Sequence, residues 1–181
     1  MRELAVTIRF TSPCLGNVRR QYRQRGKIRH YFVLPRTPDR TQVVFMPSWW
    51  QATLRKAAEI LCRHQKDVLD VRFAPAVQGT PRSIPEFFYR RHQTPFQYSR
   101  HEAFYAGDEI TVTCVVPATI SDEDMVKLLT YAGKYCGMSP AHPNKFGFYD
   151  VVSVVPTGDF SSLKPITVLS DTPRENVDAA R

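Results

Sequence analysis

The sequence predicts an α+β fold in which two helices cover one face of an antiparallel sheet. Two separate segments share the order strand, proline, serine-capped helix and strand. The strand-like runs alternate apolar and polar residues, and the helical runs place apolar residues three and four positions apart. With one early strand set aside as an accessory hairpin, the elements follow the order β-α-β-β-α-β. This order is typical of a ferredoxin-like (RRM-type) sheet, whose second face is open for binding.

The composition is that of a globular protein with enough apolar residues to form a core. The chain has 181 residues, of which 43% are hydrophobic, and its 25 Lys and Arg outnumber its 17 Asp and Glu. This length predicts a single domain. We expect this domain to span 1–156, with long basic and aromatic insertions at 14–40 and 79–107. Residues 157–181 are expected to form a C-terminal arm or tail.

The first half of the chain contains the first strand–helix–strand unit. Ser48 and Gln51 form a capping box that predicts a helix over 48–64. Trp49 lies beside the apolar face of this helix and is a candidate for a stacking or partner contact. The apolar face itself comprises Trp50, Leu54, Ala57, Ala58 and Leu61. The strands predicted in this half are 4–10, 30–34, 41–46 and 68–77.

The second half of the chain repeats this pattern. Residues 108–116 predict the clearest strand, and Ser121 with Asp124 forms a second capping pair that predicts a helix over 121–136. The apolar stripe of this helix comprises Met125, Leu128, Leu129, Ala132 and Cys136. The last strand, 146–155, is apolar at nearly every position, which predicts a place at the centre of the sheet.

The strongest functional feature is a basic segment interleaved with aromatic residues. No acidic residue lies between Glu3 and Asp39, whereas arginine is frequent there. Arginine binds phosphate oxygens in a bidentate manner, and aromatic rings stack on bases. Single-stranded nucleic acid is a partner that uses both groups, and a solvated basic loop is the simpler alternative. The candidate nucleic-acid-binding residues in this segment are Arg19, Arg20, Tyr22, Arg23, Arg25, Lys27, Arg29, His30 and Tyr31.

A second basic and aromatic cluster lies within residues 80–106. Its phenylalanines, Phe87 and Phe88 among them, could instead form a small core beneath a loop. Its arginines are harder to bury, so two such segments together favour a nucleic-acid surface. The candidate binding residues in this cluster are Arg82, Arg90, Arg91 and Arg100.

The sequence contains no motif for a metal site or a cofactor, and we expect neither. The five histidines lack metal-ligand spacing, and the four cysteines stand in apolar sequence, which predicts reduced packing residues. No nucleophile motif, phosphate-binding loop or paired-carboxylate motif is present. The candidates for acid–base chemistry are His30 beside Tyr31, and His101 beside Arg100, which would act in a metal-independent endoribonuclease.

The C-terminal half contains residues that resemble a known family. The segments 107–112 (GDEITV), 131–138 (YAGKYCGM) and 145–151 (KFGFYDV) are similar to motifs of the RAMP superfamily, the RRM-like subunits of CRISPR effector complexes. The opening strand and its end at 10–16 (FTSPCLG) also resemble this family, so that the resemblance covers about 60 of the 181 residues. It implies binding to RNA or to a protein–RNA complex. It also implies that Lys145 and Gly147 represent the family's glycine-rich loop, with Phe146 in place of one glycine.

These observations lead to hypotheses from different classes. The first is a module that binds single-stranded RNA or DNA, together with other subunits, within a ribonucleoprotein complex. The second is a protein-interaction subunit or inhibitor that docks on a nucleoprotein complex, and the endoribonuclease is a further alternative. No apolar run is long enough to cross a membrane, and the first residues lack the apolar run of a signal peptide. We therefore expect a cytoplasmic protein with no membrane partner.

Overall fold

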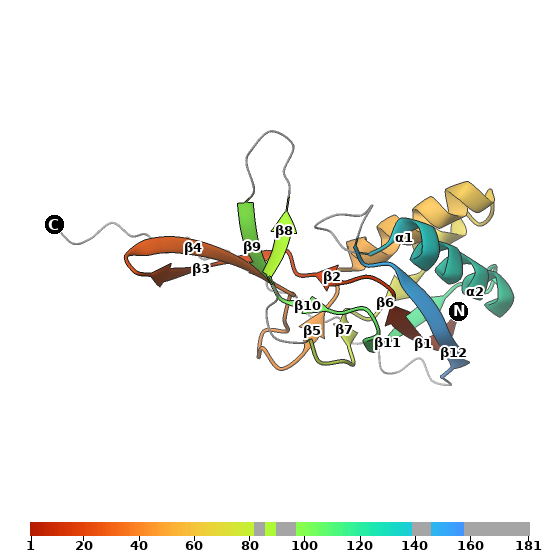
Figure 1. The fold of residues 1–181 in the computed structure, drawn as a ribbon. Helices are drawn as coiled ribbons and strands as arrows, with labels where there is room; N and C mark the ends of the chain where they lie inside the picture. Colours follow the sequence, from red (N-terminus) through yellow and green to blue (C-terminus); the bar gives the residue numbers. More distant parts are fainter. Residues whose placement is uncertain (82–85, 90–96, 139–145, 158–181) are drawn as a thin grey trace.

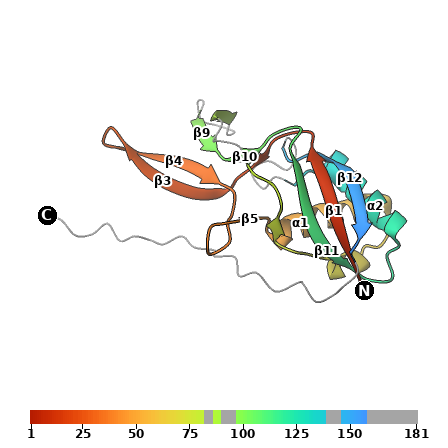
Figure 2. The same cartoon turned by 90° about the horizontal axis from the view of Figure 1, so that it is seen from below.

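The computed structural model describes residues 1–81, 86–89, 97–138 and 146–157. Its central unit consists of the strands β1 (Arg2–Phe10), β6 (Arg72–Phe73), β11 (Glu109–Val116) and β12 (Tyr149–Pro156) and the helices α1 (Pro47–Leu61) and α2 (Asp122–Tyr131). The strands form an antiparallel sheet with the order β12-β1-β11-β6. Both helices lie on one face of this sheet (Figure 2). The predicted α+β class, with antiparallel pairing and two helices, is confirmed.

The central strands β1 and β11 form the floor of the core, as their alternation predicts. Leu4, Val6, Ile8 and Phe10 are buried beneath the helices, as are the alternate residues of β11 from Ile110 to Val116. The opposite face of the sheet carries small and charged groups, such as the Thr7 and Thr111 hydroxyls, which lie 2.9 Å apart. This face therefore lacks the aromatic rings of a base-stacking platform in the described part of the sheet.

The two helices differ in how they begin. Ser121 Oγ accepts a hydrogen bond from the Asp124 amide at 3.1 Å, which confirms the predicted cap of α2. The cap predicted for α1 is wrong, because the helix begins at Pro47 and makes no side-chain cap bond. Instead, the Gln51 carboxamide donates to the Val71 carbonyl, at 2.5 Å, and ties α1 to the chain that follows it. Pro47 explains the difference, since its fixed φ favours the first helical position.

The aromatic residue beside the α1 stripe belongs to the core. Trp49 is only 8% exposed and packs against Phe45, with ring centroids 5.3 Å apart. Its assignment as a stacking or partner contact is wrong. Trp50 is fully buried as predicted, and its ring stacks on that of Phe73 at 4.3 Å.

Two predicted strands differ from the structure. Residues 68–77 form a 3₁₀ turn (Asp67–Asp70), the short strand β6 and the short strand β7 (Ala76–Val77), which pairs with β5 (Val43–Val44). Pro75 separates β6 from β7, because a proline cannot donate to a strand ladder. The predicted strand 41–46 is correspondingly reduced to β5. The chain thus changes partners within the segment predicted as one strand.

The last strand lies at an edge of the sheet and not at its centre. β12 pairs only with β1 in the described sheet, and its register shifts between Thr7 and Ile8. The bulge at this shift interrupts the regular alternation of inward-facing and outward-facing residues in β12. Two of its valines, Val152 and Val155, are 44% and 52% exposed. The run of apolar residues therefore reflects an irregular edge strand rather than burial on both faces.

The predicted second helix continues beyond α2 in a different geometry. Residues Ala132–Cys136 form a π-helical turn that packs against β12. A Cβ atom at Gly133 would lie 2.2 Å from the carbonyl oxygen of Tyr149, so this contact requires glycine. No helix in the described part of the chain is long and apolar enough to span a membrane.

A second sheet extends away from the central unit (Figure 1). It consists of β3 (Val18–Gln24), β4 (Lys27–Val33), β9 (Gln97–His101) and β8 (Glu86–Tyr89), in the order β3-β4-β9-β8. The strands β2 (Cys14–Leu15) and β10 (Ala103–Phe104) pair with each other and connect this sheet to the core. The predicted strand 30–34 is thus the second half of a longer strand in a protruding hairpin.

Candidate nucleic-acid interface

The basic segment forms the β3–β4 hairpin, which is closed by a two-residue turn. Arg25 and Gly26 form the turn, with φ angles of 49° and 73°, and Gln24 pairs with Lys27 across it. Positive φ at both central residues is typical of a type I′ turn, whose twist matches that of the strands it joins. The sequence interpretation missed the first strand of this hairpin. The signal was present, because a glycine sits in a two-residue gap between two equal extended runs.

Within the described residues, the hairpin carries arginines that form no ion pair with an acidic side chain. Arg19, Arg23 and Arg25 are exposed, and Arg20 is half-buried. Within the described residues, Arg20, Arg23 and Arg25 form no ion pair. Exposed, unpaired guanidinium groups along one narrow hairpin form a positive surface that suits a phosphate backbone.

The pairing of β3 with β4 shows which of the other candidate residues of the hairpin lie opposite each other. Tyr22 lies opposite Arg29, and Gln21 lies opposite His30. Tyr31 lies opposite Arg20 and is half-buried. The side chains of Tyr22, Lys27, Arg29 and His30 lie outside the described part of the chain. Their positions on the hairpin are therefore known from the backbone alone.

The structure brings the second basic and aromatic cluster beside the first. β9 runs parallel to β4, with Arg100 next to Tyr31 and His101 next to Phe32. Of Arg100 only the backbone position is described. The remaining candidates, Arg82, Arg90, Arg91 and Lys145, lie outside the described residues. The two segments predicted to converge thus belong to one sheet, although they are far apart in the sequence.

An ion pair fixes the foot of the hairpin. The Arg36 guanidinium contacts the Glu102 carboxylate, whose second oxygen accepts a hydrogen bond from the Leu34 amide at 2.9 Å. A Cβ atom at Gly16 would lie 2.2 Å from the carbonyl carbon of Val33, so the backbone passes closely at this point. The sequence interpretation missed Glu102, because its partner lies 66 positions away. Arg36 is therefore part of the foot and not a free cation.

His101 is a packing residue at this foot. Its side chain is buried, with 7% of the residue exposed, and its Nδ1 lies 2.9 Å from the Gly16 carbonyl oxygen. Its ring stacks on Phe32, with centroids 4.7 Å apart. Burial lowers the pKa of His101, and the hydrogen bond to Gly16 only partly opposes this effect. A neutral, buried imidazole does not fit the acid–base role considered for His101.

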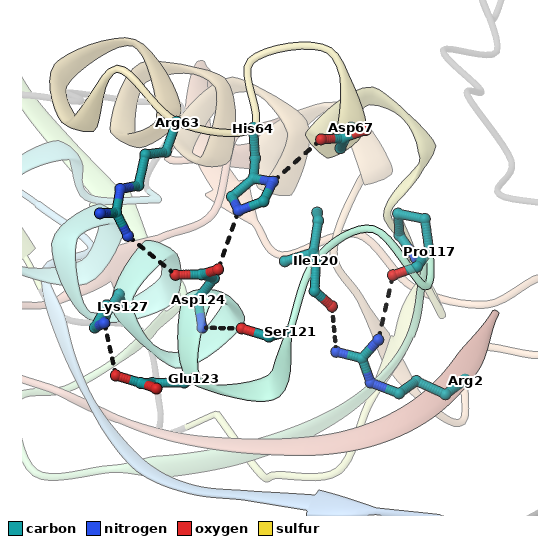
Figure 3. Close-up of polar contacts among 10 residues, drawn as sticks. All are labelled: Arg2, Arg63, His64, Asp67, Pro117, Ile120, Ser121, Glu123, Asp124 and Lys127. Carbon is teal, nitrogen blue, oxygen red and sulfur yellow. Dashed lines mark hydrogen bonds and ion pairs between the residues drawn. The ribbon is translucent and has the colours of Figure 1, made fainter.

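Several charged side chains of the helix layer are paired (Figure 3). Arg2 contacts Asp122 at 2.5 Å, Arg63 contacts Asp124 at 3.4 Å, and Lys127 contacts Glu123 at 2.7 Å. His64 lies between Asp67 and Asp124, with each ring nitrogen 3.1 Å from a carboxylate oxygen. The hydrogen bond to Asp67 is the main cause that raises the pKa of His64, and the contact with Asp124 adds to it.

The cysteines and acidic residues do not form a metal site in the described part of the chain, which holds no cluster of three or more metal-ligating side chains. Cys14, Cys114 and Cys136 are buried, and burial raises the pKa of Cys14 and Cys114 to about 12. Cys62 is exposed, so its assignment as a packing residue is wrong. It occupies a left-handed conformation just after α1, where the chain leaves the helix surface.

Comparison with known proteins shows similarity in fold. No protein-family model matches this chain, and no relative of it is found among the curated proteins. A chain of the type III-B Cmr-beta complex, solved by cryo-EM with cognate target RNA, aligns with a TM-score of 0.56 at 10% identity. The alignment covers 86% of this chain and 60% of that chain, so this protein spans about 60% of that neighbour's length.

Two further structures align less closely. A chain of a type IV-B CRISPR complex aligns with a TM-score of 0.44 at 11% identity, covering 97% of this chain and 96% of that chain. A Cas6 mutant aligns with a TM-score of 0.30 at 17% identity, covering 84% and 53%. The type III-B match shows that this chain shares its fold with a chain of that complex.

Proposed function

We propose that this protein binds single-stranded RNA along the β3–β4 hairpin, as a subunit of a CRISPR-type ribonucleoprotein complex. The observation that carries this proposal is the set of exposed arginines on a protruding hairpin. Arg23 and Arg25 lie at and beside its tip and have no acidic partner within the described residues. Arginine forks bind phosphate oxygens, and the release of counterions from the nucleic acid adds to the affinity.

The fold supports a role within such a complex. The order of elements in the central unit supports our proposal of a ferredoxin-like, RRM-type domain. We propose that this domain spans residues 1–156, with the hairpin and the β8–β9 strands as insertions. The neighbour with the higher TM-score is a chain of a complex bound to target RNA. The face of the central sheet lacks aromatic rings in its described part, so the hairpin is the better candidate for the RNA contact.

A second contact is proposed at the loop that resembles the family's glycine-rich loop. Gly147 has a φ of 75°, and its amide donates to the Pro13 carbonyl at 2.9 Å. The Phe148 amide donates to Ser12 Oγ at 2.9 Å, so this loop is held against the end of β1. We propose that Lys145, just before it, contributes a further cation to the RNA surface.

The experiment is a binding titration with labelled single-stranded RNA, and with unlabelled single-stranded DNA as competitor. We expect the variant Arg23→Ala/Arg25→Ala to bind RNA at least about tenfold more weakly than the wild type, since each charged hydrogen bond contributes about 1.5–3 kcal/mol. The matched control, Arg55→Ala/Lys66→Ala, removes two exposed cations from the helix layer. It is expected to bind like the wild type.

Two results would overturn this proposal. Absence of RNA binding by the wild type would favour the alternative of a protein-interaction subunit. An equal loss of affinity in both double variants would show that only the net charge matters. Analysis of the bound RNA on a denaturing gel tests the endoribonuclease alternative, because cleavage that disappears in His30→Ala would reveal an enzyme.

A further inference from the structure

We infer that a pocket at the foot of the hairpin binds one unstacked base of the RNA strand and so confers base preference. The inference rests on the proposed function, because the hairpin must hold the strand. The pocket has a volume of about 400 Å³ and lies between the turn at residues 36–43 and the segment 77–81. This volume is within the range of about 300–1,000 Å³ that is usual for small-molecule sites.

The walls of the pocket are held by short-range contacts. Arg36 and Val43 form an isolated β-bridge, and the Thr37 amide donates to the Gln42 carbonyl at 3.0 Å. The carboxylate of Asp39 accepts hydrogen bonds from the hydroxyl and the amide of Thr41, at 2.8 and 3.1 Å. The opposite wall is fixed where β5 pairs with β7. The pocket therefore forms part of the folded chain.

The groups that face a ligand are uncharged hydrogen-bonding side chains. Gln42, Gln78 and Thr80 line the pocket, and all three residues are exposed. A carboxamide offers both a donor and an acceptor, which is the combination that base edges present. Val43 and Val77, which pair across β5 and β7 and are almost fully buried, form part of the apolar lining on one side. These groups are typical of sites that read single-stranded RNA through unstacked bases.

The charges at the end of the pocket favour a base over a phosphate. Arg36 lines the pocket, but its guanidinium is paired with Glu102. Both carboxylate oxygens of Glu102 are engaged, one by Arg36 and one by the Leu34 amide. A phosphate would meet this carboxylate without a free cation beside it, whereas a neutral base would not be repelled.

The hairpin and the pocket are close enough for one strand to reach both. The seven residues of β4 span about 23 Å at about 3.3 Å per residue, and Arg36 follows β4 closely. A stacked strand rises about 3.4 Å per nucleotide, so about seven nucleotides cover this distance. An oligonucleotide of about 12 nucleotides reaches both sites, whereas one of about four nucleotides does not.

The test measures the affinities of the full chain for labelled oligo(U), oligo(C) and oligo(A) of about 12 nucleotides. We expect the wild type to bind one homopolymer at least about fivefold more tightly than the weakest. In Gln42→Met/Gln78→Met this ratio should fall to near one, while the affinity for the weakest homopolymer stays unchanged. The control Gln65→Met changes an exposed carboxamide that does not line the pocket and should keep the ratio.

The outcomes separate this inference from the proposed function. In Arg23→Ala/Arg25→Ala all homopolymers should weaken by a similar factor, and the ratio should remain. Binding of all three homopolymers with equal affinity, or a ratio that survives in the double glutamine variant, would overturn the pocket and leave the hairpin proposal intact. Failure of the wild type to bind any homopolymer would overturn both.

Discussion

The sheet-and-helix core and the β3–β4 hairpin differ in how their charges are used. In the core, the half-buried Arg2 and the exposed Arg9 and Arg63 each contact a carboxylate, whereas the exposed Arg55 and Lys66 form no ion pair within the described residues. On the hairpin, Arg23 and Arg25 contact none within the described residues. Paired charges are already neutralised, while unpaired ones remain available to an anionic ligand. We therefore propose that the core provides stability and that the hairpin provides the binding surface.

The largest effect on stability is expected in the core. Leu54 and Leu128 are fully buried beneath the sheet. Leu54→Ala and Leu128→Ala should each lower the free energy of unfolding by about 2–5 kcal/mol, because each leaves a cavity. Chemical denaturation measures this change. Val126→Ala, at an exposed position of α2, is the control and should cost far less; equal losses at all three positions would refute the assigned core.

A smaller effect is expected where the hairpin joins the core. Gly16→Ala places a Cβ atom 2.2 Å from the Val33 carbonyl carbon, so the hairpin foot must shift. We expect a loss of about 1–3 kcal/mol in the free energy of unfolding, as is usual for overpacking. RNA affinity should also fall, because the hairpin is displaced. The exposed neighbour Asn17 provides the control Asn17→Ala, and a wild-type melting curve for Gly16→Ala would contradict the observed close approach.

The helix caps give a matched pair of substitutions. Ser121→Ala removes the observed cap of α2 and should cost about 1 kcal/mol. Ser48→Ala, at the first turn of α1, removes a hydroxyl that makes no cap bond and should be nearly neutral. Thermal unfolding of both variants measures the difference. Equal losses would show that the cap assignment derived from the sequence, and not the structure, is correct for α1.

The smallest effect concerns His64 and pH. Asp67 and Asp124 raise the folded-state pKa of His64 above its usual value of 6.5. The interactions of the protonated ring therefore contribute fully to stability when the pH is below 6.5. That contribution is lost as the pH rises through the folded-state pKa. Unfolding midpoints between about pH 6 and 9 should therefore fall more in the wild type than in His64→Gln. Identical pH profiles would show that the two carboxylates do not hold the imidazolium.

The contact between His64 and Asp124 gives the opposite dependence of stability on pH in the acidic range. The hydrogen bond from His64 is the main cause that lowers the pKa of Asp124, with Ser121 as the second cause. A lowered carboxylate pKa contributes stability above its usual value and loses it as the pH falls through the folded-state value. His64→Gln should therefore weaken the acid-induced loss of stability as well.

The elements that could be predicted from sequence are those whose pattern is local. The alternation in β1 and β11 and the Ser121 cap of α2 each involve neighbouring residues, and the structure contains all three. The type I′ turn at Arg25-Gly26 was also local, but the basic charge of the segment drew the interpretation toward a loop. The aromatic Trp49 was misplaced because two adjacent residues of a helix start can both be buried.

The features that could not be predicted depend on distant partners. The parallel pairing of β4 with β9 brings Tyr31 beside Arg100, and no local pattern encodes this contact. The Arg36–Glu102 pair is equally remote in sequence. The edge position of β12 follows from its bulge against β1, whereas its composition resembles that of a central strand. The basic surface was therefore predictable by composition, but the sheet that holds it was not.

We propose that the unpaired cations of the hairpin, and not the net charge of the protein, bind the RNA. The most direct test is the dependence of RNA affinity on salt in the wild type and the two double variants. Each phosphate contact with a single strand contributes a slope of about −0.7 in log K against log salt. We predict that Arg23→Ala/Arg25→Ala reduces the magnitude of the slope by about 1.4 and that Arg55→Ala/Lys66→Ala leaves it unchanged. Equal slopes in all three proteins would contradict the claim.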